Sequence, residues 1–151
     1  VPSPRTPVEQ SEMPRGSETI LLTEDEDSVR ALSTLILRSC GYTVLEASDG
    51  EEAMLVARRH AGAIDILVTD VVMPRMSGPR LADLLTLERP TMRVLMLSGY
   101  SGEAVMRHGV LDQVAALLHK PFGPTALARA VREVLDAPLP GTRPGHESSS
   151  G

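Results

Sequence analysis

Five short apolar segments alternate with five segments of helical periodicity, and this alternation constrains the fold more than any other feature of the chain. The apolar segments, which predict buried strands, are residues 19–23, 43–47, 64–69, 93–97 and 115–119. The segments that predict helices are residues 28–40, 51–60, 79–87, 103–108 and 124–135. Because the connections are short, we expect an α/β fold in which a doubly wound parallel sheet carries helices on both faces.

Local signals support several of the predicted helix ends. Gly41 supplies a stop for the first predicted helix, because glycine readily adopts the left-handed conformation that ends many helices. Asp49 is a suitable N-cap for the second helix, and Pro79 suits the start of the third. The one cysteine, Cys40, is expected at a half-buried helix end, and it cannot form an internal disulfide.

The two ends of the chain differ in composition from its middle. Four of the 12 prolines lie within residues 1–14 and three within 138–144, beside serine, glycine and charged residues. Such segments bury too little apolar surface to fold. We therefore expect a disordered N-terminal tail at 1–17, one folded domain at 18–136 and a disordered C-terminal tail at 137–151.

Charge and hydropathy argue against two classes of partner. The formal net charge of -5 argues against a nucleic-acid surface, which normally shows a basic patch. No apolar run approaches the ~20 residues that span a bilayer, and residues 1–16 lack the apolar region of a signal peptide. We therefore expect a cytoplasmic domain that contacts neither nucleic acid nor membrane.

Polar residues stand at the carboxyl ends of four predicted strands. Residues 24–27 (Glu-Asp-Glu-Asp) follow the first strand, Asp70 the third, Ser98 the fourth and Lys120 the fifth. Doubly wound sheets bind ligands at this edge, where the direction of winding changes. In the strand order 2-1-3-4-5, which is common for such sheets, the first and third strands are neighbours at that point. We therefore expect the acidic residues and Lys120 to meet.

Several carboxylates at one edge repel one another, and a bound cation would relieve that repulsion. Two like charges about 4 Å apart repel by roughly 4 kcal/mol at an effective dielectric constant of 20. Either proton uptake or a divalent cation offsets this cost. Mg²⁺ suits a site made of carboxylates, water and a phosphate. A carboxylate, a metal ion, an ammonium group and a hydroxyl group together predict phosphoryl transfer onto Asp70.

Five segments carry a resemblance to a known family. They are ILLTEDEDSVR (20–30), GYTVLEASDGEEAM (41–54), DILVTDVVMPRMSG (65–78), VLMLSGY (94–100) and LHKPF (118–122). Over residues 18–136 the chain resembles response regulator receiver domains of two-component signalling, and most of all those of hybrid sensor histidine kinases. The resemblance implies a flavodoxin-like (βα)5 sheet with strand order 2-1-3-4-5.

The resemblance also implies a role for each site residue. Asp70 would be the phosphoacceptor, Asp25 a direct Mg²⁺ ligand, and Glu24 a ligand acting directly or through water. The remaining implied roles are a metal-binding backbone carbonyl at Val72, a switch hydroxyl at Ser98, a phosphoryl contact at Lys120 and a cis peptide bond at Lys120–Pro121. Two positions depart from the family pattern. Glu24 stands where many receivers carry an aspartate, and Leu117 stands where receivers usually carry a switch aromatic residue.

Several interpretations of the function stay open at this point. The resemblance implies a partner, either a histidine kinase or a histidine phosphotransfer domain, and allows a phosphorylation-dependent homodimer. The domain can belong to a hybrid kinase or stand alone as a single-domain regulator. It can also be a degenerate receiver that only binds proteins. A flavodoxin-like cofactor-binding protein or a haloacid-type phosphatase fits less well, because residues 24–27 would repel a cofactor phosphate and position 72 is not an acid.

Overall fold

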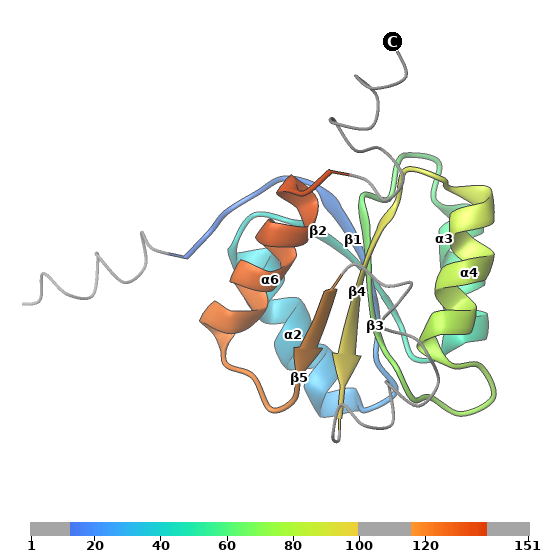
Figure 1. Ribbon diagram of the computed structural model, residues 1–151, viewed down its shortest axis with the longest axis horizontal. Helices are drawn as coiled ribbons and strands as arrows, with labels where there is room; N and C mark the ends of the chain where they lie inside the picture. Colours follow the sequence, from blue (N-terminus) through green and yellow to red (C-terminus); the bar gives the residue numbers. More distant parts are fainter. Residues whose placement is uncertain (1–12, 100–115, 139–151) are drawn as a thin grey trace, which may run out of the picture.

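The computed structural model describes residues 13–99 and 116–138, and within them five strands form a single parallel sheet (Figure 1). The strands are β1 (Thr19–Thr23), β2 (Thr43–Ala47), β3 (Ile66–Asp70), β4 (Arg93–Ser98) and β5 (Ala116–His119). Their order is β2-β1-β3-β4-β5, and every neighbouring pair is parallel. The predicted fold class and strand order are therefore confirmed.

Four helices of the described chain cover the two faces of the sheet. They are α2 (Asp27–Ser39), α3 (Gly50–Arg59), α4 (Gly78–Glu88) and α6 (Pro124–Asp136). Figure 1 shows α2 and α6 on one face and α3 and α4 on the other. The helix predicted at residues 103–108 and the first residue of the strand predicted at 115–119 lie outside the described residues.

Alternate residues of the central strands point into two separate aliphatic cores. Ile20 and Leu22 of β1 pack with α2 and α6, whereas Leu21 packs with α3 and α4. The same alternation places Val68 in the first core and Leu67 in the second. Because the central strands β1, β3 and β4 are buried on both faces, their positions in the sheet are fixed, and so are the positions of the residues at their carboxyl ends.

The structure moves several predicted boundaries by one or two residues. The third strand starts at Ile66 rather than at residue 64 and includes Asp70, which pairs in register with Leu97. The fourth strand likewise includes Ser98. Both polar residues therefore belong to the sheet itself, where backbone hydrogen bonds hold them more firmly than a loop would.

The structure confirms the predicted start of α3 and the stop after α2, but not the expected exposure of Cys40. The Asp49 side chain accepts a hydrogen bond from the Glu52 amide at 2.8 Å, which confirms the predicted N-cap of α3. Gly41 has a φ angle of 106°, as a helix stop requires. Cys40 lies at the end of α2, as expected, but it is buried rather than half-buried, with 2% of its surface exposed. It is buried because it packs into the core beneath α2 and α6.

Residues 13–17, the end of the predicted N-terminal tail, are described and contact the domain. The Gly16 amide donates to the Cys40 carbonyl at 3.1 Å, and the Arg15 carbonyl accepts from Arg132 at 3.1 Å. Met13 packs against the core beneath α6. Residues 1–12 and 139–151 lie outside the described residues. Among the helices that are described, none combines the length and the apolar character that a membrane crossing needs.

The first residue of α4 lies unusually close to the end of β3. The Gly78 amide donates to the Val71 carbonyl at 2.8 Å. A Cβ atom at position 78 would collide with the carbonyl oxygen of Asp70 and would lie 3.1 Å from the sulfur of Met96. Only glycine therefore fits where α4 begins.

Replacing Gly78 with alanine should destabilise the fold. We expect Gly78→Ala to lower the free energy of unfolding by about 1–3 kcal/mol, the usual cost of overpacking, although alanine is the better helix former. Gly123→Ala is the matched control, because a Cβ atom there meets nothing within 4 Å. Urea denaturation of both variants measures the difference. Equal stability of the two would show that α4 can move away from Asp70 at no cost.

Candidate functional site

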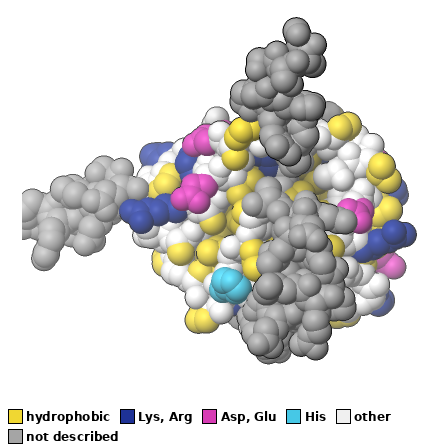
Figure 2. Space-filling model, viewed as in Figure 1, with side chains coloured by type: hydrophobic (Ala, Val, Ile, Leu, Met, Phe, Trp, Pro, Cys, Tyr) yellow, Lys and Arg dark blue, Asp and Glu magenta, His cyan; other side chains and the backbone are white. Residues whose placement is uncertain are grey.

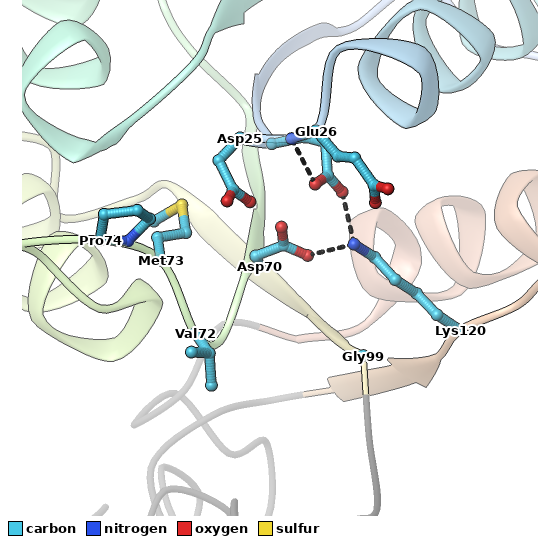
Figure 3. A pocket seen from close by; sticks show the side chains of 9 residues that line it. Asp25, Glu26, Asp70, Val72, Met73, Pro74, Gly99 and Lys120 are labelled. Carbon is cyan, nitrogen blue, oxygen red and sulfur yellow. Dashed lines mark hydrogen bonds and ion pairs between the residues drawn. The ribbon is translucent and has the colours of Figure 1, made fainter.

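The carboxyl ends of the strands open onto one cavity of about 590 Å³ (Figure 3). The loops after β1 and β3 form most of its wall, and the residues after β4 and β5 close it. The lining residues are Glu24, Asp25, Glu26, Asp70, Val72, Met73, Pro74, Gly99 and Lys120. The cavity thus brings together residues that are far apart in the sequence.

Glu24 follows β1 and is almost completely buried, with 1% of its surface exposed. Its Oε1 atom lies 2.7 Å from the Nζ atom of Lys120. Its Oε2 atom accepts a hydrogen bond from the Glu26 amide at 3.0 Å. Both carboxylate oxygens therefore have partners from the protein itself, as a buried charge requires.

Asp70, the last residue of β3, is 5% exposed and shares the ammonium group of Lys120 with Glu24. The Nζ atom lies 2.8 Å from the Oδ1 atom of Asp70. Apart from this ion pair, Oδ1 is buried and has no further hydrogen-bond partner in the described part of the chain. Asp70 is thus the less satisfied of the two buried carboxylates.

The pKa values of Asp70 and Lys120 reflect this incomplete compensation of the Asp70 charge. Burial, and then the neighbouring Glu24, raise the pKa of Asp70 to about 8, although the Lys120 ammonium opposes the change. Burial lowers the pKa of Lys120, but contacts with Asp70 and Glu24 outweigh this and raise it above its ordinary value. The ammonium therefore stays charged, whereas Asp70 favours either a proton or an additional cation.

Oxygen atoms of three carboxylates could act together as metal ligands. One oxygen from each of Glu24, Asp25 and Asp70 lies within 4.8 Å of the others. Asp25 is exposed and faces the cavity, whereas the other two are buried (Figure 3). Carboxylate oxygens are the preferred ligands of hard divalent cations, and within residues 13–99 and 116–138 the Oδ1 atom of Asp70 has no partner besides Lys120. The residues present therefore fit such a cation.

The other predicted site residues border this cluster. Ser98 is buried at the end of β4, and its carbonyl accepts a hydrogen bond from the Lys120 amide at 2.8 Å. Val72 lies at the edge of the cavity with 66% of its surface exposed, and its side chain points away from the carboxylates (Figure 3). The Lys120–Pro121 peptide bond is cis, as expected. Leu117 is partly buried in β5.

One contact with the acidic loop, residues 24–27, was not predicted from the sequence. The Nη1 atom of Arg30 donates a hydrogen bond to the carbonyl oxygen of Glu24 at 2.7 Å. Arg30 lies three residues after Asp27 in α2, a spacing typical of an ion pair, and that ion pair is present at 2.8 Å. Nothing in the spacing indicates that the same side chain reaches back to the end of β1.

Comparisons with known proteins agree with this geometry. The sequence profile of the response regulator receiver domain matches residues 20–132. Sensor kinase CckA of Brucella abortus (strain 2308) is 43% identical over 121 residues, which are 80% of this chain but 13% of that protein. Response regulator receiver protein CpdR of the same strain is 30% identical over 118 residues, which are 78% of this chain and 97% of CpdR.

A solved structure shows the same likeness in three dimensions. The crystal structure of the receiver domain from the hybrid histidine kinase CckA superposes with a TM-score of 0.65 at 38% sequence identity. The match covers 78% of this chain and 99% of that one. Profile, sequence and structure agree with the resemblance read from the motifs, and the chain belongs to the response regulator receiver domain family of two-component signalling.

Proposed function

We propose that the domain accepts a phosphoryl group on Asp70 from a phosphohistidine of a kinase or of a phosphotransfer domain. The observation that carries this proposal is the buried Oδ1 atom of Asp70, whose one partner among the described residues is the Lys120 ammonium at 2.8 Å. The carboxylate lines an open cavity, so that an incoming phosphorus atom can reach it. A nucleophile beside a fixed positive charge suits phosphoryl transfer.

In the proposed reaction, a carboxylate oxygen of Asp70 forms a bond to phosphorus while the bond from phosphorus to the histidine nitrogen breaks. The histidine leaves as an imidazole, and the product is an acyl phosphate on Asp70. Lys120 stabilises the negative charge of the phosphoryl oxygens, and the hydroxyl group of Ser98 donates a hydrogen bond to one of them. These two residues come from the ends of β5 and β4, on the side of Asp70 away from β1.

We propose Mg²⁺ as the cation of the site, bound by Asp25 and Asp70, with Glu24 acting directly or through water and with the backbone carbonyl of Val72 as a further ligand. The mutual approach of the three carboxylates supports this assignment. When bound, Mg²⁺ supplies positive charge that neutralises phosphoryl oxygens. Without that positive charge, the three carboxylates would repel the phosphoryl oxygens.

The similarity to CckA favours an origin as the receiver part of a hybrid sensor histidine kinase. The alternative is a free-standing regulator, which the nearly complete coverage of CpdR supports.

A domain that takes phosphoryl groups derived from ATP would work in the cytoplasm. Basic and acidic side chains are interspersed on the face shown in Figure 2, which supports a protein partner, or a second copy after phosphorylation, rather than nucleic acid.

Mg²⁺ should stabilise the native domain. We expect a rise in the thermal midpoint with Mg²⁺ concentration, because the ion binds the folded state and relieves repulsion among the carboxylates. Asp25→Ala should abolish most of that rise. Asp83→Ala, which removes an exposed acid of α4, is the control and should keep it. Absence of a Mg²⁺ effect in the wild type, or an equal effect in Asp25→Ala, would contradict the proposed metal site.

Asp70→Asn should abolish phosphorylation while preserving the fold. Incubation of the wild type with acetyl phosphate and Mg²⁺ should add the mass of one phosphoryl group, which hydroxylamine should remove because the product is an acyl phosphate. The asparagine variant should stay unmodified and, without Mg²⁺, should be at least as stable as the wild type, since it removes a poorly compensated buried charge. Intact-mass spectrometry decides, and a phosphorylated variant would refute the assignment.

A further inference from the structure

We propose that Arg30 is a positioning residue for the acidic cluster, and that it holds the backbone segment from which Asp25 reaches the cation. This inference rests on the proposed function. The observation behind it is the hydrogen bond of 2.7 Å from the Nη1 atom of Arg30 to the carbonyl oxygen of Glu24. That oxygen belongs to the peptide group that joins Glu24 to Asp25, so the bond fixes the direction in which the chain leaves β1.

Arg30 completes a set of bonds that immobilise Glu24. The Glu24 amide donates to the Ala47 carbonyl of β2 at 3.1 Å, and its side chain is held by Lys120 and by the Glu26 amide. The carbonyl group is the remaining polar group of the residue, and Arg30 is its partner. Without that donor, the peptide group before Asp25 would lose the bond that sets its orientation.

The guanidinium group of Arg30 is itself held from two other directions. Its Nη2 atom lies 2.8 Å from the Oδ1 atom of Asp27, and its Nε atom lies 3.7 Å from the Oε1 atom of Glu46. The side chain is only 18% exposed. A planar guanidinium with donors on several edges can join such partners at once, whereas a lysine ammonium cannot reproduce that fork. Arg30 thus links the end of β1, the start of α2 and β2.

The start of α2 depends on these contacts. Its N-cap residue, Glu26, makes no side-chain capping bond. The Glu24 carboxylate accepts from the Glu26 amide instead, and Arg30 ties the first turn of the helix back to the Glu24 carbonyl. Asp25 has an exposed side chain between these fixed points. Its position toward Asp70 is therefore set by its neighbours, as the orientation of metal ligands commonly is.

The direction of the change in Mg²⁺ affinity distinguishes a positioning role of Arg30 from a purely electrostatic one. Arg30 is a cation near a cation-binding site, so a role as a charge alone would weaken Mg²⁺ binding, and removal of Arg30 would then strengthen it. A positioning role predicts the opposite result, because the loss of an orienting group typically weakens metal affinity by about 10- to 100-fold.

The experiment measures the Mg²⁺ affinity of the wild-type full chain and of its Arg30→Met and Arg38→Met variants. Amide chemical shifts in an NMR titration report the binding. Arg38 is a matched control on the same helix, because it also lies 3.7 Å from Glu46 and also donates to a backbone carbonyl, that of Val44 at 2.9 Å. Both substitutions remove one positive charge, but only the first removes a contact with the acidic loop. We expect Mg²⁺ affinity to fall about tenfold or more in Arg30→Met and to change less than twofold in Arg38→Met.

Every outcome of this comparison bears on the proposal. Unchanged or tighter Mg²⁺ binding in Arg30→Met, or an equal loss in Arg38→Met, would overturn it. Arg30→Gln carries the same expectation and replaces Arg30→Met if that variant does not fold; if neither folds, Arg30 serves the fold and the proposal is wrong. Asp25→Ala should lose binding in the same assay. A wild type that binds no Mg²⁺ would overturn the proposed function as well, whereas normal binding in the wild type and in Arg30→Met would overturn this inference alone.

Discussion

Two buried carboxylates share one ammonium group at the carboxyl edge of the sheet, and the rest of the site follows from that imbalance. Glu24 has both oxygens occupied by Lys120 and the Glu26 amide, while in the part of the chain that the structure describes Asp70 has only the ion pair with Lys120. Taking a carboxylate out of water without full compensation is costly, so the site is disposed to accept a cation or an electrophile. The carboxyl group that is least compensated is the one we propose to react.

Two apolar cores, one on each face of the sheet, stabilise the fold against this unfavourable arrangement of charges. The central strands are fixed from both sides, so the residues at their ends cannot move apart to relieve repulsion. The start of α4 also packs against the end of β3, and contacts from α2 hold the end of β1. Rigid backbone is what allows a few side chains to keep an unfavourable charge distribution.

Periodicity predicted the parallel sheet and its strand-end residues, because buried strands follow simple patterns. The strand order, on which the expected meeting of residues 24–27, Asp70 and Lys120 depends, was implied by the resemblance to receiver domains. They did not predict which acid would be buried. Glu24 and Asp25 are adjacent in sequence, yet only Glu24 faces the interior. The burial of Cys40 and the long reach of Arg30 were missed for the same reason, since both depend on which elements pack together rather than on local spacing.

The contact between Gly78 and the carbonyl oxygen of Asp70 also limits which residues the chain can carry at this point. The aspartate and the glycine eight residues later are coupled sterically, because a side chain at position 78 would push against the backbone of Asp70. Val72, by contrast, points outward with 66% of its surface exposed, so a different side chain there would alter the rim of the cavity without touching Asp70.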